Sequence, residues 1–151
     1  MRNKGSSYFF RFIALTYFAV VFYIIFLARR RNGHTDYRAL ADFKIFDKFK
    51  VFGHWESLAE AEKVSYAQDI FGNVLLFLPF IPALYFLTRK DYSWKIALCW
   101  IVGTSAAIEI NQYLFNRGVF DLDDIVLNTL GGVLGFWCYS MIINRKWEVF
   151  K

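Results

Sequence analysis

Four long apolar runs are the feature that most limits how this chain can fold. They cover residues 8–28, 70–87, 94–115 and 125–143, with charged or polar residues between them. A helix needs about 20 apolar residues to cross the hydrocarbon core of a bilayer. Hydrophobic residues make up 57% of the chain, more than a soluble domain usually carries. The pattern predicts an all-α membrane protein, a polytopic bundle of about four transmembrane helices that forms a single domain over residues 1–151.

The first run has to be weighed against a signal peptide. It is longer than the apolar region of such a peptide, and Arg29-Arg30-Arg31 follows it where a small-residue cleavage site would stand. We therefore interpret it as a retained span. In the second run, Pro79 and Pro82 each lack a backbone donor and predict a kink.

A long polar loop, residues 29–69, separates the first two spans. Phe46, Phe49 and Phe52 are three residues apart in a stretch where aromatic residues interleave with lysines. This spacing predicts a short helix lying in the membrane interface, and a short strand is the alternative. Two pairs are spaced as capping boxes and predict helix starts ahead of the second span: Ser57 with Glu60, and Ser65 with Gln68.

Charge placement favours lipid over nucleic acid as the partner. The formal net charge is +5, but the basic residues lie mainly at the ends of the apolar runs, where lipid head groups would be. We predict membrane lipids as partners and no nucleic acid. Cys99 and Cys138 lie inside apolar runs without paired spacing, so we predict no disulfide, metal site or cofactor.

Orientation is less sharply indicated by the sequence. Four spans place both termini on one side, and the Lys and Arg residues divide equally between the two sides. The short turn 88–94 is strongly basic, and short loops weigh most in the positive-inside rule. We therefore predict that the termini are cytoplasmic, although Arg29-Arg30-Arg31 points the other way.

Polar residues of the spans gather toward one membrane face, where the second span starts, the third ends and the fourth starts. Ser105, Glu109 and Gln112 are four and three residues apart, so they share one helical stripe. Ionisable side chains are costly in a span and usually face the bundle interior or water. The residues predicted to form one binding site are Asn73, Glu109, Gln112, Arg117, Asp121, Asp124 and Asn128.

The residues of this region resemble the VanZ family. That family's pattern is roughly Ser-x3-Glu-x2-Gln, then Arg, Asp, Asp and Asn-x2-Gly-x3-Gly, and an upstream Gly-Asn-x3-Phe-x-Pro. The matching residues here are Ser105, Glu109, Gln112, Arg117, Asp121, Asp124, Asn128, Gly131 and Gly135, with Gly72, Asn73, Phe77 and Pro79 upstream. The family's Asn-Leu-x-Pro-Phe element is missing, and residues 41–46 stand in its place.

The resemblance covers about residues 8–143. It implies a multi-pass protein of the bacterial cytoplasmic membrane. The family's namesake lowers susceptibility to the lipoglycopeptide antibiotic teicoplanin, so the resemblance also implies a link to antibiotic resistance and the cell envelope.

Three functional hypotheses follow. A binder would capture a lipid-linked cell-wall precursor or a lipoglycopeptide at an outward-facing polar site. An enzyme would use Glu109 with Asp121 or Asp124 as acid and base on a lipid-linked envelope substrate. A scaffold would use the same polar residues only to join helices, with Arg117 as the nearest basic partner of Glu109. A divalent ion held by Asp121, Asp123 and Asp124 is a weaker alternative.

Overall fold

The computed structural model describes residues 4–25, 42–115 and 119–142. Within these ranges the chain is helical and contains no strand. Two features that the sequence singled out, Arg117 and the cluster Arg29-Arg30-Arg31, lie outside the described residues. The elements are α1 (Lys4–Tyr23), η3 (Lys48–Ser57), α2 (Glu60–Phe77), α3 (Phe80–Thr88), α4 (Trp94–Leu114) and α5 (Leu122–Ile142).

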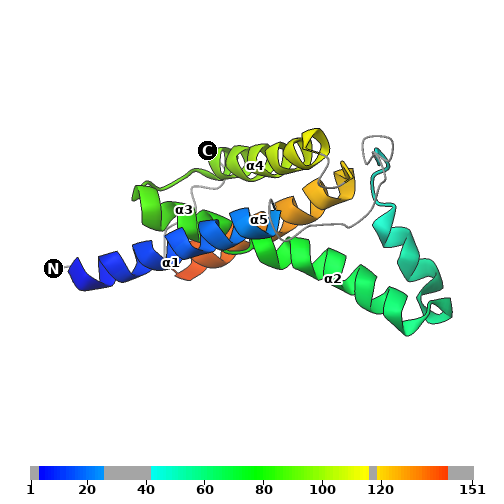
Figure 1. Ribbon diagram of the computed structural model, residues 1–151. Coiled ribbons are helices and arrows are strands. Elements are labelled where there is room, and N and C mark those ends of the chain that lie inside the picture. The colour runs from blue at the N-terminus through cyan, green and yellow to red at the C-terminus, as the bar shows by residue number, and fades with distance from the viewer. Residues whose placement is uncertain (1–3, 26–41, 116–118, 143–151) are drawn as a thin grey trace.

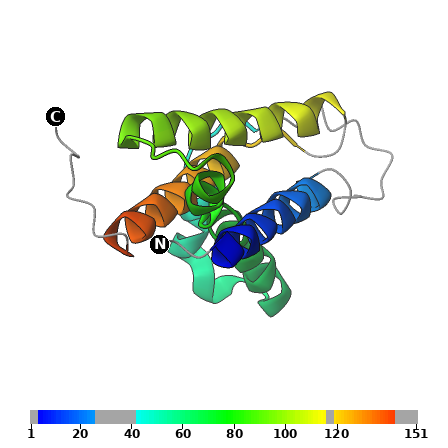
Figure 2. The same ribbon diagram turned by 90° about the vertical axis from the view of Figure 1, so that its left-hand side faces the viewer.

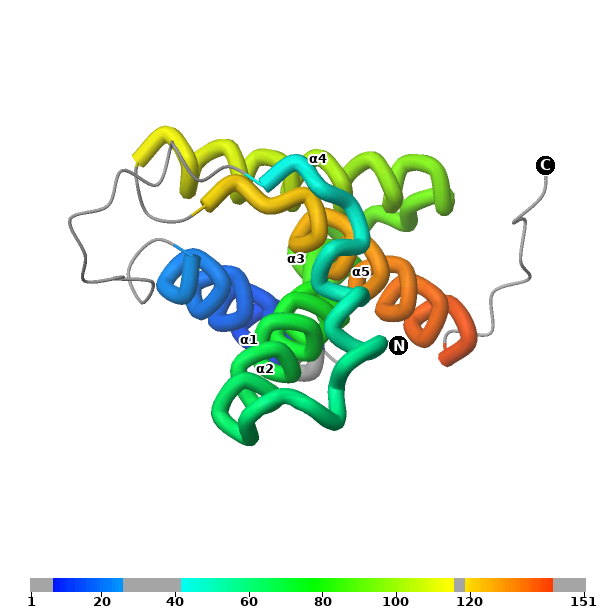
Figure 3. Tube along the Cα trace, turned by 90° about the vertical axis from the view of Figure 1, so that its right-hand side faces the viewer, coloured from blue at the N-terminus to red at the C-terminus, as the bar shows by residue number. Residues whose placement is uncertain are grey.

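The long elements run back and forth, as the spacing of the apolar runs predicts (Figure 1). The helix α5 contacts α2, α3 and α4, while α1 packs on α3. Views from the two ends show α1 and α5 on opposite sides of the α2–α3 segment, with α4 crossing over one side (Figures 2 and 3). The all-helical part of the predicted fold is therefore confirmed for the described residues.

Two helical segments are long and apolar enough to cross a membrane. They are Glu60–Thr88, which joins α2 and α3, and Leu122–Ile142. Residues Ser7–Tyr23 form a shorter apolar helix. A crossing by all four predicted spans stays a prediction.

The predicted kink lies where the two prolines stand. The chain turns at residues 78–79, and Pro79 caps the start of α3. Pro82 falls within the first turn of α3, where backbone N–H groups have no partner inside the helix. The prolines therefore divide the second apolar run into two helices without leaving a broken hydrogen bond in mid-helix.

The start of α2 corrects one sequence prediction. The helix begins at Glu60 and is continuous through Ser65, so the pair Ser65 and Gln68 does not start a helix. Glu62 performs the capping instead, because its Oε2 accepts a hydrogen bond from the Ala59 backbone N–H at 3.0 Å.

The predicted aromatic helix is present in the loop. The rings of Phe49, Phe52 and Trp55 contact one another in series along η3, and Phe46, which precedes the helix, contacts Phe49. Side chains three residues apart align in a 3-10 helix, which explains the series. The alternative of a strand here is wrong, since residues 48–57 are helical.

Large apolar side chains are exposed on α1, α4 and α5. They include Phe9, Phe12, Trp100 and Trp137, each with between 49% and 69% of its surface exposed. Exposed apolar surface of this extent marks a contact with lipid or with another protein.

Candidate functional site

The segment 42–57 folds back onto the turn that precedes α5. The Asp42 N–H donates to the carbonyl of Phe120 at 2.8 Å, and the Leu122 N–H donates to the carbonyl of Asp42 at 3.3 Å. These bonds form an isolated bridge between Asp42 and Asp121. We call residues 42–57 the docked segment and residues 121–124 the acidic turn.

Asp123 holds the docked segment through its backbone. Its carboxylate accepts hydrogen bonds from the N–H groups of Phe46 and Lys48 at 2.5 and 2.8 Å. Phe46 adopts a left-handed conformation with φ of 65°. Asp123 lies in the first turn of α5 and is 1% exposed. Each of its carboxylate oxygens accepts one of these hydrogen bonds, so the buried charge has partners.

Among the described residues, Lys48 brings a positive charge to the site. Its Nζ lies 2.8 Å from Asp121 Oδ2 and also forms an ion pair with Asp124. Burial alone would lower the pKa of Lys48, but the carboxylates of Asp124 and Asp121 outweigh it and raise the pKa above its usual value. The charge that balances the acidic turn therefore comes from the long loop.

Hydrogen bonds join α2, α4 and α5 at the same level. The Asn73 Nδ2 of α2 donates to Asp124 Oδ1 at 2.6 Å. The backbone N–H of Asp121 donates to Glu109 Oε2 of α4 at 3.2 Å. One turn deeper, Asn128 Nδ2 of α5 donates to Ser105 Oγ of α4 at 2.9 Å.

Asn128 retains an unused acceptor. It is 3% exposed, and its Oδ1 is buried with no hydrogen-bond partner among the described residues. Buried polar atoms nearly always have a hydrogen-bond partner, so an unpaired one indicates a place where a ligand or water could donate. Glu109 and Gln112 are similarly buried, at 1% and 3% exposure.

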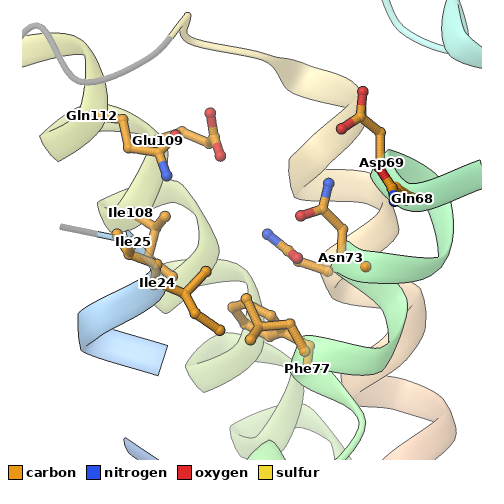
Figure 4. A pocket seen from close by; sticks show the side chains of 12 residues that line it. Ile24, Ile25, Gln68, Asp69, Asn73, Phe77, Ile108, Glu109 and Gln112 are labelled. Carbon is orange, nitrogen blue, oxygen red and sulfur yellow. The ribbon is translucent and has the colours of Figure 1, made fainter. Parts of the chain in front are cut away.

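A pocket of about 210 Å³ opens beside these residues. The close view shows Asn73 and Glu109 toward one end of it and Ile24 and Phe77 toward the other (Figure 4). Among the described residues, twelve line the pocket: Ile24, Ile25, Gln68, Asp69, Gly72, Asn73, Leu76, Phe77, Ile108, Glu109, Gln112 and Asn128. The lining thus divides into a polar end and an apolar end.

The structure brings together the predicted site residues that it describes. Asn73, Glu109, Gln112 and Asn128 line the pocket, while Asp121 and Asp124 lie beside it through the bonds given above. Arg117 lies outside the described residues. That these residues bind a ligand stays a prediction.

Lys48 is the residue that sequence reasoning missed. Lys44, Lys48 and Lys50 all lie in the stretch where lysines interleave with aromatic residues, and nothing in their spacing distinguishes one from the others. The proximity of the docked segment to the acidic turn depends on chain folding over a gap of about 75 residues. The structure also weighs against a divalent ion here, because the carboxylates of Asp121, Asp123 and Asp124 are engaged by Lys48 and by backbone N–H groups.

Comparison with known proteins identifies the family. The model of the VanZ/LLP1 family matches residues 12–144, which is most of the chain. The chain belongs to the VanZ/LLP1 family. This agrees with the resemblance found in the sequence, and the VanZ family is membrane-associated.

One VanZ relative is close enough to align in part. Protein VanZ of Enterococcus faecium is 30% identical over 74 residues, which is 49% of this chain and 45% of that protein. The alignment therefore spans less than half of the relative's length. No solved structure matches the chain.

Proposed function

We propose that this VanZ-family protein binds a cell-envelope ligand in the pocket between α2, α4 and α5 and thereby lowers glycopeptide susceptibility. In this proposal it crosses the bacterial cytoplasmic membrane about four times, with cytoplasmic termini and an outward-facing pocket. The ligand would be a lipid-linked precursor or a lipoglycopeptide.

The observation that carries the proposal is the unpaired Asn128 Oδ1 in the pocket lining. A buried acceptor left unpaired costs about 1–3 kcal/mol. If Asn128 served only to join α4 and α5 through its bond to Ser105, an apolar pair of similar shape in place of the two residues would join the helices as well. A ligand with a hydrogen-bond donor would satisfy the remaining oxygen.

The two alternatives have less support from the contacts. The ion pairs with Lys48 occupy the carboxylates of Asp121 and Asp124, which weighs against either as a catalytic acid or base. A pure scaffold would need neither the pocket nor an orphaned acceptor. Glu109 remains the candidate for catalysis in the enzyme hypothesis, since it lines the pocket.

Substitution of charged groups tests the proposal. Glu109→Gln, Arg117→Gln and Asp124→Asn are made singly, with Glu56→Gln on the exposed face of η3 as the control. Each variant is checked for insertion and for its melting temperature, and is then assayed for teicoplanin susceptibility of the host cell. We expect the first three to insert but to lose at least part of the protection, and the control to behave as the parent.

Two outcomes would contradict the proposal. Stable variants that all protect as the parent does would show that the polar residues only join helices. Variants that fail to insert would favour the scaffold. A chemically changed envelope precursor in cells that express the parent, absent with Glu109→Gln, would instead establish the enzyme.

A further inference from the structure

The pocket has room for one small group. Its volume of about 210 Å³ is below the range of about 300–1,000 Å³ that is typical of sites for drug-sized ligands. A whole glycopeptide does not fit, whereas a single ring-sized head group does.

The described part of the polar lining carries no cation that would hold an anion. Among the described residues that line the pocket there is no Lys, Arg or His, and Asp69 and Glu109 add carboxylates. Phosphate groups in proteins are usually bound by Arg, Lys or unoccupied helix N-termini. Lys48, the nearby cation, is paired with Asp121 and Asp124, and the start of α5 carries acidic residues.

The same lining is suited to hydroxyl groups. Four amide side chains contribute to it, from Gln68, Asn73, Gln112 and Asn128. An amide both donates and accepts hydrogen bonds, and so does a hydroxyl. The unpaired Asn128 Oδ1 requires a donor, which a hydroxyl supplies.

The apolar end indicates what the head group is attached to. Ile24 and Ile25 follow α1, Leu76 and Phe77 end α2, and Ile108 belongs to α4. In Figure 4 Ile24 and Phe77 lie at the end away from the carboxylate of Glu109, while Ile25 and Ile108 lie between that end and Gln112. An occupant that satisfies both ends has a hydroxyl-bearing head and an apolar chain.

We propose that the pocket binds the uncharged sugar head group of a glycolipid, held by the amides of α2, α4 and α5 with its chain against the isoleucine end. This inference rests on the proposed function, because it names the ligand class of the same pocket. It predicts that the sugar, and not a phosphate group, lies at the polar end of the pocket.

Gly72 offers a way to block the pocket without disturbing the fold. It lines the pocket from α2, and a Cβ added there meets nothing within 4 Å. In Gly72→Leu the side chain occupies pocket space, and Leu is a better helix former than Gly. Gly103→Leu is the matched control, because Gly103 is also helical and open but lies on α4 away from the pocket.

The experiment uses the full chain, purified in a detergent without a sugar head group and placed in phosphatidylcholine vesicles. The vesicles contain a small fraction of either glucosyl diacylglycerol or phosphatidylglycerol with the same acyl chains. Lipid retained by the protein is measured by native mass spectrometry. We expect the glucosyl lipid to be retained in preference to phosphatidylglycerol, at about tenfold higher affinity. Gly72→Leu should lose this retention and Gly103→Leu should keep it.

A second variant reports on the hydrogen bonds alone. Ser105→Ala with Asn128→Leu replaces both partners of a buried bond by apolar groups, a change that is nearly neutral for folding. It should melt as the parent does yet lose the preference for the glucosyl lipid. Retention of that preference would overturn the assignment of a sugar to the amide end.

The other outcomes separate the two proposals. If phosphatidylglycerol is preferred and Gly72→Leu abolishes its retention, the pocket is a ligand site but the sugar assignment is wrong. If Gly72→Leu retains either lipid as the parent does, or the parent retains neither, the pocket does not bind a glycolipid and the sugar assignment is overturned. Susceptibility assays on the charge variants then decide the proposed function separately.

Discussion

Two glycines of α5 set how closely this helix approaches its neighbours. A Cβ built on Gly131 would overlap the backbone carbonyl of Val74 in α2, and one on Gly135 would overlap that of Leu78. Small residues four apart permit such backbone contact between membrane helices. Because α2 carries Asn73 and α5 carries Asn128, the glycines also fix the width of the pocket.

The first prediction concerns Gly135→Ala. The added methyl group meets backbone that cannot rotate away, so α5 must shift, and overpacking of this kind costs about 1–3 kcal/mol. Gly132→Ala should cost less, because the atoms it meets belong to the side chain of Ile101. Gly103→Ala meets nothing within 4 Å and should be neutral or stabilising. Melting temperatures in one detergent rank the three, and equal values for Gly135→Ala and Gly103→Ala would contradict the packing.

These residue-scale features were visible in the sequence. The spacing of Gly131 and Gly135 and of Ser105, Glu109 and Gln112 places each set on one face of a helix whatever the tertiary fold. What the spacing did not show was the partner of each face. Asn128 bonds Ser105 rather than Asn73, and Asp124 takes the bond from Asn73.

At the scale of elements, the docked segment joins the long loop to the acidic turn. Lys48 is 18% exposed in its side chain and faces Asp121 and Asp124, while the neighbouring pair of Lys50 and Asp47 is largely exposed. Removing one partner of a buried ion pair costs about 3–5 kcal/mol, whereas exposed pairs contribute little. The attachment therefore depends on Lys48 rather than on Lys50.

The second prediction is that the docked segment detaches at high pH. Folding raises the pKa of Lys48, so the stabilisation is fully present below its usual value of about 10.5 and is lost as the pH rises through the raised value. Spin labels at residues 56 and 114, with Cys99 and Cys138 replaced by Ala, report the distance between η3 and the end of α4. The distance distribution should broaden at alkaline pH, and Lys48→Met should broaden it at neutral pH while Lys50→Met should not.

Tyrosine side chains lose a proton in the same pH range as lysine, and they could also cause detachment at high pH. The variant Lys48→Arg separates the two causes. Arginine stays charged throughout this range, so the variant should remain docked at a pH where the parent has detached. Detachment of both at the same pH would show that Lys48 is not the group that titrates.

Contacts between segments far apart in the chain, unlike local spacing, cannot be predicted from sequence patterns. The series Phe46, Phe49 and Phe52 is local, and its spacing alone predicted a short helix. The bond from the Phe46 N–H to Asp123 joins residues 77 apart, and no local pattern encodes it. Nearness in sequence predicts Arg117 as the basic partner of Glu109, whereas Lys48 reaches Asp121 and Asp124 through the fold.

At the scale of the whole molecule, the two ends of the bundle differ in charge. Arg89 donates to the backbone carbonyl of Ser7 at 3.2 Å, so the basic turn between α3 and α4 lies beside the start of α1. The acidic turn and the docked segment lie at the opposite end (Figure 1). Lys and Arg are equal in number on the two sides, so the proposed cytoplasmic location of this end rests on the shortness of the basic turn with Arg89 and Lys90.

The third prediction follows from this asymmetry. In a background without Cys99 and Cys138, one cysteine is placed at Gly53 and another, in a separate protein, at Lys90. Gly53 is exposed on the docked segment, with nothing within 4 Å of an added Cβ, and Lys90 is exposed in the basic turn. A thiol reagent that cannot cross membranes should label Gly53→Cys in intact cells and Lys90→Cys only after permeabilisation, because an odd number of helices separates the two positions.

Labelling of both from one side would rule out the four-span arrangement. The reverse pattern would keep that arrangement but turn the molecule over, and the pocket would then open toward the cytoplasm, where an externally added glycopeptide does not reach it.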